Sequence, residues 1–316
     1  MSRHPTFRAP EPLIRAFDAA RDRWLLSRLR RIQPAPPSWP LEPAHTSRAE
    51  IIWPEKYPEK WLGPLLHGLR GLVTVRHSPS LVMQGPVALG VLRTSDVERP
   101  FAVDISDYHP VDESIVDQVC CYFKWQHDIR GYPFGSVVPG GYVGADMAVY
   151  RFASVLRSPS AARAPTLYGR FNMSLGTRAR TRALEVLRDQ HRIDFVGEPR
   201  TIRYSRYLEE ASRSALCLDL PGNGNLCFRL VDYLAIGAAI VTMRPKNALP
   251  VPLRDGHEAF FFKEDLSDLV DLCEDLLARP DELIAARAAA ASYFDRFLHS
   301  SQLAGYYLST LFDRAR

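Results

Sequence analysis

ALCLDLPGNGNLCFRLVDYLAIGAAIVTMR, residues 215–244, is the stretch of this sequence that decides its fold. Its apolar run Ala215–Leu218 predicts a buried strand, and the glycine- and asparagine-bearing bend Pro221–Asn225 predicts a turn. The amphipathic run Phe228–Ile236 then predicts a helix, and Ala239–Met243 a second buried strand. Ligands of open α/β sheets bind in the crevice at the carboxyl ends of the strands, where loop amides and a helix N-terminus hold anions. The bend is therefore the first candidate for a binding site.

The same alternation of strands and helices continues on both sides of this stretch. Further strands are expected at Thr166–Phe171, Ile193–Val196 and Ala259–Phe262, and further helices at Arg178–Gln190, Tyr204–Ser212, Leu266–Leu277 and Ser301–Asp313. Strands that alternate with helices favour a parallel sheet covered by helices on both faces. Residues 161–300 are therefore expected to form an α/β domain, with residues 301–316 as a terminal helix.

Residues 49–160 show a different pattern of apolar and turn-forming residues. Short strand-like runs occur at Glu50–Trp53, Gly71–Val75, Val87–Leu92, Pro100–Ile105 and Gln118–Phe123, punctuated by glycine and proline, with few clear helices. This pattern predicts a smaller, degenerate α/β domain. The Ser/Pro/Ala-rich strip Arg157–Pro165 reads as the linker to the next domain.

Residues 1–48 read as an N-terminal extension. Leu13–Arg31 predicts a basic amphipathic helix, and the proline-rich strip that follows it cannot remain helical. One interpretation is peripheral docking on an anionic membrane surface. The other is packing on the body of the protein or on the partner of a homodimer.

The amino-acid composition limits the classes of function to be considered. The chain has 316 residues, 46% hydrophobic and 24% charged, with a net charge of +4, which permits an anionic substrate but gives no indication of nucleic-acid binding. Its five cysteines form no C-x-x-C pair, which is typical of buried, reduced thiols. There is no signal-peptide pattern and no apolar run of about 18 residues, so a soluble, cytoplasmic protein is expected.

The second half of the sequence resembles the nucleotide-sugar donor domain of GT-B glycosyltransferases, especially exostosin-like and related bacterial members. Three features carry the resemblance: the helix, strand and PGNGN bend from Tyr204 to Asn225; the run RLVDYLAIG from Arg229 to Gly237, with Asp232 where the family has Glu; and DGHE from Asp255 followed by FFFKEDLSDLVDLCEDLLARPDEL. The resemblance covers roughly residues 166–310 and implies two Rossmann-like domains facing a central cleft, with the terminal helix crossing back to the first. It further implies a glycosyltransferase that moves a sugar from a nucleotide-sugar donor to a sugar, lipid-linked or small-molecule acceptor.

Candidate donor-binding residues follow from the chemistry of a departing nucleoside diphosphate, whose negative charge needs preorganised N–H donors and cations. Gly222, Asn223 and Gly224 allow the backbone to approach the donor closely, and Arg229 can pair with the diphosphate through two N–H groups. Arg170, at the end of an expected strand, points into the same crevice if the sheet is parallel. By the resemblance, Asp232 accepts a hydrogen bond from a ribose or sugar hydroxyl.

An inverting transfer needs a base for the acceptor hydroxyl, on the side of the first domain. The candidates are Asp107 and Asp104, in VDISDYH after an expected strand, and then His127 in KWQHD, with His109 beside them. The sequence contains no Asp-x-Asp triplet, so no metal ion and no resident cofactor are expected, the nucleotide-sugar being a co-substrate. The alternative hypothesis is an inactive transferase-like module that binds a partner or a membrane.

Overall fold

The first half of the chain folds around a mixed seven-stranded sheet. The computed structural model describes residues 35–157, 163–197 and 202–314, together with residues 16 and 20, so the expected helix 13–31 lies outside the described residues. The strands are β1 (Glu50–Pro54), β2 (Thr74–Ser78), β3 (Met83–Gln84), β4 (Val87–Arg93), β5 (Glu98–Asp104), β6 (Cys121–Lys124) and β7 (Val137–Pro139). They lie in the order β2-β1-β4-β5-β6-β7, with β3 paired to β4. Strand β4 runs antiparallel to its neighbours, whereas β5, β6 and β7 run parallel to one another.

Three short or medium helices accompany this sheet among the described residues: α2 (Pro43–Thr46), α3 (Glu59–Arg70) and α4 (Glu113–Val116). Helix α3 is the longest of the three, and the sequence pattern did not predict it. Its apolar side, with Leu62, Leu65 and Leu69, is buried in the core, although Pro64 lies inside the helix. A proline in the second turn removes one amide donor but leaves the period of the leucines intact.

The second half forms a five-stranded parallel sheet. Its strands are β8 (Ala164–Tyr168), β9 (Asp194–Val196), β10 (Ser214–Asp219), β11 (Ile240–Met243) and β12 (Phe260–Phe262), in the order β12-β11-β10-β8-β9. The helices are α5 (Val149–Leu156), α6 (Thr177–Arg188), α7 (Tyr204–Arg213), α8 (Phe228–Ala235), α9 (Leu269–Leu277), α10 (Pro280–Tyr293), the π-helical turn η1 (Phe294–Leu298) and α11 (Ser300–Asp313). The parallel, Rossmann-like α/β arrangement expected for this half is confirmed.

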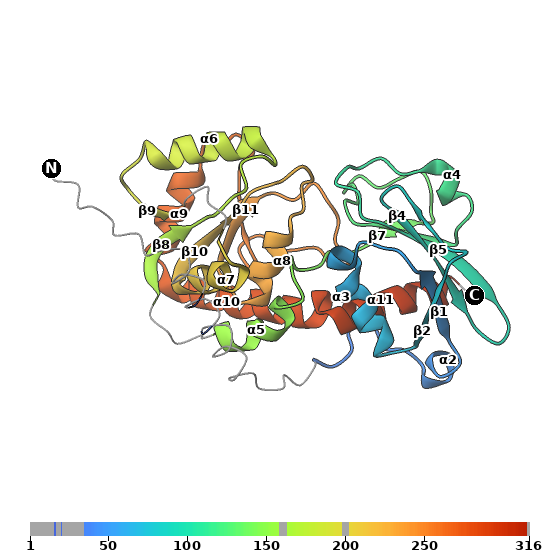
Figure 1. Cartoon of the computed structure of the whole chain (residues 1–316). Helices are drawn as coiled ribbons and strands as arrows, with labels where there is room; N and C mark the ends of the chain where they lie inside the picture. Colours follow the sequence, from blue (N-terminus) through green and yellow to red (C-terminus); the bar gives the residue numbers. More distant parts are fainter. Residues whose placement is uncertain (1–15, 17–19, 21–34, 158–162, 198–201, 315–316) are drawn as a thin grey trace.

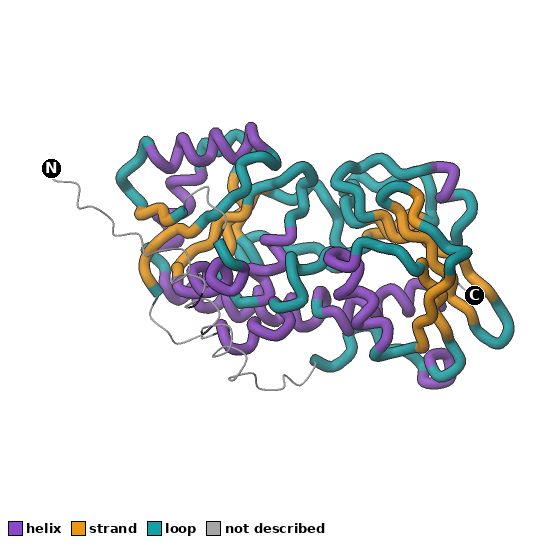
Figure 2. The backbone as a smooth tube through the Cα atoms, in the orientation of Figure 1, coloured by secondary structure: helices purple, strands orange, loops and turns teal. Residues whose placement is uncertain are grey.

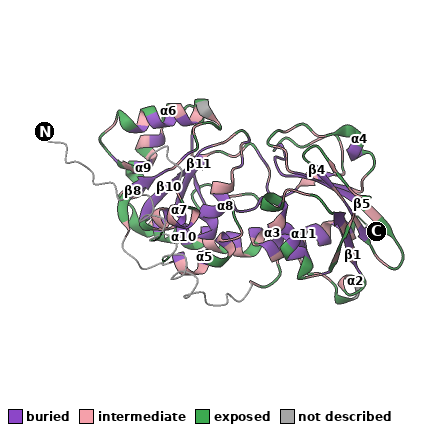
Figure 3. Ribbon diagram, in the orientation of Figure 1, coloured by how far each residue is buried: buried purple, intermediate pink, exposed green. Residues whose placement is uncertain are grey.

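Helices cover both faces of the second sheet, and the two lobes are plain in the chain trace (Figures 1 and 2). Leucines of α6 and α9, such as Leu187 and Leu276, share one core, whereas Leu208 of α7 and Leu230 of α8 belong to another. Burial is greatest in the central strands, such as β6 and β10, in which every residue is buried, whereas the edge strands β2 and β9 are largely exposed (Figure 3). Strand β8 lies between β9 and β10. After β8 the chain continues to β9 at one edge of the sheet, and after β10 it continues to β11 on the opposite side. The carboxyl ends of β8 and β10 thus form the topological switch point of the sheet.

Helix α11 returns from the second lobe to the first, where it lies beside α3 (Figure 1). The approach is close: a Cβ added to Gly68 of α3 would lie 2.0 Å from the carbonyl oxygen of Ser300. The hydroxyl of Tyr307 donates to the carbonyl of Gly140 at 2.8 Å, just beyond β7. Helix α11 therefore connects the two lobes along one side of the molecule.

The described part of the proline-rich strip packs on α11. The amide of Gln302 donates to the carbonyls of Ala35 and Pro36, and Trp39 lies against the rings of Phe297 and Tyr306. For this strip the contacts favour packing on the body of the protein. Among the described residues, no helix has both the length and the apolar character needed to cross a bilayer.

Candidate functional site

The site begins with two loops at the switch point, residues 169–176 after β8 and residues 220–227 after β10. The loops touch each other. Gly176, with φ 60°, ends the first loop, and a Cβ there would lie 2.5 Å from the carbonyl oxygen of Pro221. Only glycine fits both this left-handed backbone and this close approach. Helices α6 and α8 begin directly after the two loops.

Arg229, in the first turn of α8, turns into the protein rather than toward solvent. Its Nη1 donates to Asp219 Oδ1 at 3.2 Å and to the carbonyl of Leu220 at 3.1 Å, and its guanidinium lies 4.6 Å from the centre of the Phe171 ring. Burial lowers the pKa of Arg229, but the carboxylate of Asp219 together with the neighbouring Tyr233, Tyr207 and Cys227 outweighs burial, and the pKa is raised. Arg229 is therefore a fixed, fully charged group at the switch point.

Arg180, which sequence reasoning missed, reaches the same place from α6. Its Nε donates to the carbonyl of Pro221 at 2.9 Å and its Nη1 to that of Asn172 at 2.6 Å, and its guanidinium lies 5.8 Å from the Phe171 ring. Burial lowers its pKa, and the positive charge of Arg229 lowers it further. The sequence placed Arg180 inside an expected helix, but nothing local shows which way the side chain points.

Asp219, at the end of β10, is the carboxylate partner of this cluster. It is buried, and Thr242 Oγ1 donates to its Oδ2 at 3.3 Å. Burial raises the pKa of Asp219, while Arg229 and Arg180 oppose the rise. Two guanidinium groups thus share one carboxylate, so the cluster keeps a net positive charge.

The helix N-termini add to this charge. Gly176 and Cys227 are the N-cap residues of α6 and α8, and neither supplies a side-chain hydrogen bond to the first turn. The first amides of a helix carry a partial positive charge and are ready donors to an anion. The N-termini of α6 and α8 lie at the switch point together with the side chains of Arg180 and Arg229. This arrangement is suited to a phosphate group.

The predicted glycine bend lies beside these groups but turns toward the first lobe. The amide of Gly222 donates to the carbonyl of Gly224 at 3.0 Å, and Asn223 is exposed at the tip. A Cβ on Gly224 would lie 2.5 Å from Gln126 Nε2 and 2.8 Å from the carbonyl oxygen of Asp107. The bend therefore forms part of the contact between the two lobes.

Arg170 and Asp232, the other two predicted donor residues, are held by internal partners. Arg170 pairs with Glu210 at 2.7 Å, while its buried Nη1 has no hydrogen-bond partner. Asp232 is buried, and its Oδ1 accepts from the Tyr204 hydroxyl at 2.6 Å and from the amide of Ala145 at 3.0 Å. Burial raises the pKa of Asp232 to about 7.

The three predicted base residues fall in different settings. Asp104 is buried and accepts from Lys124 Nζ at 2.8 Å, the Tyr122 hydroxyl at 2.7 Å and the amide of Ser106 at 2.8 Å. His127 is also buried, which lowers its pKa, and its Nδ1 has no partner. Asp107 is exposed, and its main chain touches the donor bend at Gly224. The structure therefore brings the backbone of Asp107 to the bend.

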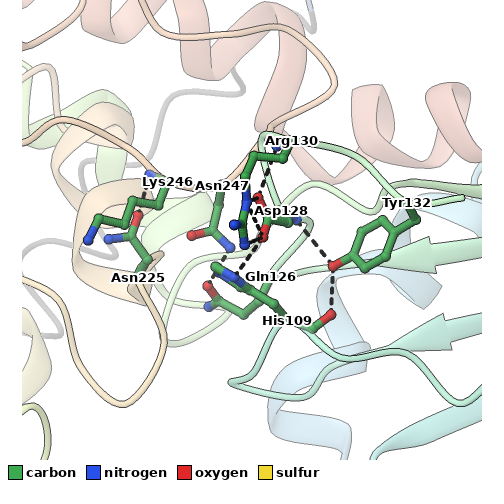
Figure 4. A network of polar contacts seen from close by, with 8 residues as sticks. All are labelled: His109, Gln126, Asp128, Arg130, Tyr132, Asn225, Lys246 and Asn247. Atoms are coloured by element: carbon green, nitrogen blue, oxygen red, sulfur yellow. Dashed lines mark hydrogen bonds and ion pairs between the residues drawn. The ribbon is translucent and has the colours of Figure 1, made fainter.

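Figure 4 shows the polar contacts between the lobes beside the bend. Gln126 accepts from Asn247 Nδ2 at 2.9 Å. It also forms two hydrogen bonds with the backbone of Leu226, at 2.9 and 3.0 Å. On the side of the second lobe, Asn225 Oδ1 accepts from the amide of Lys246 at 2.8 Å. We call this group of contacts the lobe seam.

Asp128 continues the lobe seam into the first lobe (Figure 4). It pairs with Arg130 at 2.6 Å and lies 3.2 Å from Nδ1 of His109. The side-chain hydrogen bond from Arg130 holds the pKa of Asp128 well below its usual range. His109 is therefore oriented by a carboxylate at the edge of the lobe seam, a relationship that the sequence did not indicate.

Residues 178–304 match a protein-family model described as glycosyl transferase-like. The match begins in α6, covers the glycine bend and α8, and ends in α11. It supports a glycosyltransferase-family domain and a transferase function in general. No curated protein matches the chain. In the part of the chain that the structure describes, no group of three or more His, Cys, Asp or Glu side chains could hold a metal ion.

Proposed function

We propose that this protein transfers a sugar from a nucleotide-sugar donor to an acceptor, with the donor diphosphate bound at the switch point of the second sheet. The observation that carries the proposal is the convergence of Arg180 and Arg229 on the ring of Phe171, with the carboxylate of Asp219 paired to Arg229. A net positive, largely buried cluster at the carboxyl ends of parallel strands favours a dianionic ligand.

In this proposal the protein itself supplies the charge that stabilises the leaving group. As the bond between the sugar and the diphosphate breaks, negative charge grows on the diphosphate. The two guanidinium groups and the first amides of α6 and α8 are held in place before the reaction, so they need no reorganisation. We propose that these groups act without a metal ion. Arg170, with its unpaired Nη1, extends the positive lining toward the ribose or base.

We propose Asp107 as the base that deprotonates the acceptor hydroxyl. It is exposed, and its backbone touches the bend that would carry the donor. Asp104 is less suited because three donors already occupy its carboxylate. His127 is less suited because burial disfavours its protonated form.

The two lobes then play the parts of the two domains of a GT-B transferase, with donor and acceptor meeting along the lobe seam. Gln126 joins the lobes through the backbone of Leu226 beside the proposed donor site. We propose that this contact keeps the bend closed over the donor and limits its hydrolysis. Asp232, whose Oδ1 accepts from Ala145, fixes the connection between the lobes and reaches a donor hydroxyl only through its second oxygen.

Isothermal titration calorimetry of the full chain with UDP, GDP, TDP and CDP tests the proposal. We expect one of the four diphosphates to bind saturably without added divalent metal. We also expect slow release of that diphosphate from the nucleotide-sugar that contains it. Absence of binding to all four, with and without magnesium, would refute the donor site. That outcome would favour the alternative of an inactive, partner-binding transferase-like protein.

A further inference from the structure

A pocket of about 520 Å³ opens in the first lobe, and residues between positions 84 and 122 line it. Its volume lies within the range of small-molecule sites, which is about 300–1,000 Å³. None of its lining residues takes part in the proposed donor site. The pocket is thus separate from the proposed donor site, and its wall indicates which ligand chemistry would fit it.

The buried part of the wall is polar but electrically balanced. Asp104 lines the pocket and is 2% exposed, and the ammonium group of Lys124, 2.8 Å away, compensates its charge. The hydroxyl of Tyr122 donates to the same carboxylate at 2.7 Å. Because these groups satisfy one another, a ligand there meets hydroxyl and carboxylate oxygens without a net charge.

The rim is acidic and carries hydroxyl groups. Asp112, Glu113 and Ser114 are exposed at the start of α4, and all three line the pocket. Asp112 Oδ1 accepts from both the amide and the hydroxyl of Ser114, at 3.1 and 2.6 Å. Among the described residues, no Lys, Arg or His lines the pocket. A phosphate or carboxylate entering it would face two acidic side chains with no nearby compensation, so the rim disfavours anions.

Part of the wall is apolar and flat. Pro86, Pro110 and Val111 line it beside the carboxylates. Pyranose rings present C–H faces to such surfaces and hydroxyl groups to carboxylate and hydroxyl oxygens. This combination suits an uncharged sugar better than a flat aromatic or an aliphatic chain.

The pocket also lies next to the proposed reaction centre along the backbone. Ser106 lines the pocket, and the next residue, Asp107, touches Gly224 of the donor bend. The pocket wall and the residue proposed as the base are therefore consecutive in the chain.

We propose that this pocket binds the acceptor and that the acceptor presents an uncharged, hydroxyl-rich sugar unit. The inference rests on the proposed transferase function and narrows its acceptor. Asp112 and Glu113 disfavour phosphorylated and carboxylated sugars, so we expect the anionic donor to bind the second lobe and the neutral acceptor to bind the first.

Saturation-transfer difference NMR on the full chain tests the inference with methyl α-glucoside, methyl α-mannoside, methyl α-galactoside and the 6-phosphates of the same sugars. At least one neutral glycoside is expected to bind saturably, and its 6-phosphate at least ten-fold more weakly. Ser114→Trp is expected to remove the signal by filling the pocket, whereas Ser95→Trp, in the exposed turn between β4 and β5, should not. Glu113→Lys is expected to admit the phosphorylated sugar, which a merely misfolded variant would not do.

Nucleoside diphosphate binding by the same variants separates this inference from the proposed function. Ser114→Trp should leave diphosphate binding unchanged. No glycoside binding to the natural chain, a signal that survives Ser114→Trp, or equal binding of the 6-phosphates would overturn the acceptor assignment even if the diphosphate binds. Glycoside binding without any diphosphate binding would instead overturn the donor site and leave the sugar pocket standing.

Discussion

Arg180 and Arg229 approach one aromatic ring from helices on opposite faces of the second sheet, with their guanidinium carbons 5.8 and 4.6 Å from the centre of Phe171. The two like charges repel each other, and burial together with the positive charge of Arg229 lowers the pKa of Arg180. Asp219, whose carboxylate pairs with Arg229, offsets part of this repulsion. In the proposed function a bound diphosphate would offset more of it, so we expect the repulsion to favour binding of a dianion.

Replacing Arg229 should weaken diphosphate binding. Arg229→Lys keeps a cation beside Asp219 but loses the planar fork of N–H donors, so we expect a roughly ten-fold loss of affinity with little change in folding. Arg229→Ala removes the charge as well and should cost about 1.5–3 kcal/mol of binding free energy, or roughly 10- to 150-fold. Calorimetric titration with the diphosphate that the natural chain prefers measures both effects.

Arg188→Ala is the matched control, because Arg188 is exposed at the other end of α6. Its affinity should equal that of the natural chain. Equal affinity of Arg229→Ala and Arg188→Ala for the diphosphate would show that the switch point is not the donor site.

Substituting Gly224 should disturb the contact between the lobes. The added Cβ of Gly224→Ala would lie 2.5 Å from Gln126 Nε2 and 2.8 Å from the carbonyl oxygen of Asp107, so one partner must move. We expect a loss of about 1–3 kcal/mol in the free energy of unfolding, the usual cost of overpacking. Gly135→Ala, at a glycine with nothing within 4 Å, should be neutral or slightly stabilising. Urea denaturation measures both, and equal stabilities would contradict the tight contact at Gly224.

The second sheet was predictable because its signals are local. Apolar strands such as Ala239–Met243, the glycine bend and the periodic faces of the helices each fit within a window of about fifteen residues. Helix α3 has the same periodic leucines, but Pro64 conceals it among the short strands of the first half. Nearby residues therefore predict whether a segment forms a strand or a helix, but a proline inside a helix weakens that prediction.

The directions of the functional side chains depend on contacts distant in sequence. Asp104 was expected to be a free base, but the parallel register of β5 and β6 places it directly opposite Lys124, which forms its ion pair. Arg180 joins the site only because α6 packs beside the bend forty residues further along the chain. Neither the strand register nor this docking has a local signal, so the sequence predicts the crevice at the strand ends but not which side chains line it.

Asp107 and Asp104 should respond differently to the same change. Asp107→Asn, at an exposed carboxylate, should leave folding intact and lower kcat about 10²- to 10⁴-fold, the usual contribution of a general base. Asp104→Asn leaves the fully buried ammonium of Lys124 without its counter-ion and should cost about 3–5 kcal/mol of stability. Transfer assays and thermal denaturation of both variants measure the difference. Full activity in Asp107→Asn would remove this residue from the mechanism.

Asp232→Asn should change how stability depends on pH. Burial raises the pKa of Asp232 from its usual value near 3.8 to about 7, so between these values the folded chain holds a proton that the unfolded chain has lost. The free energy of unfolding contributed by this group therefore falls as pH rises from about 4 to 7, by at most about 1.4 kcal/mol per unit, and levels off above 7. Asn stays neutral and keeps the Oδ1 that accepts from Tyr204 and Ala145. The two chains should thus be nearly equal in stability at pH 4, and the variant should be more stable at pH 8. Parallel curves of stability against pH for the two chains would show that Asp232 ionises at its usual pKa.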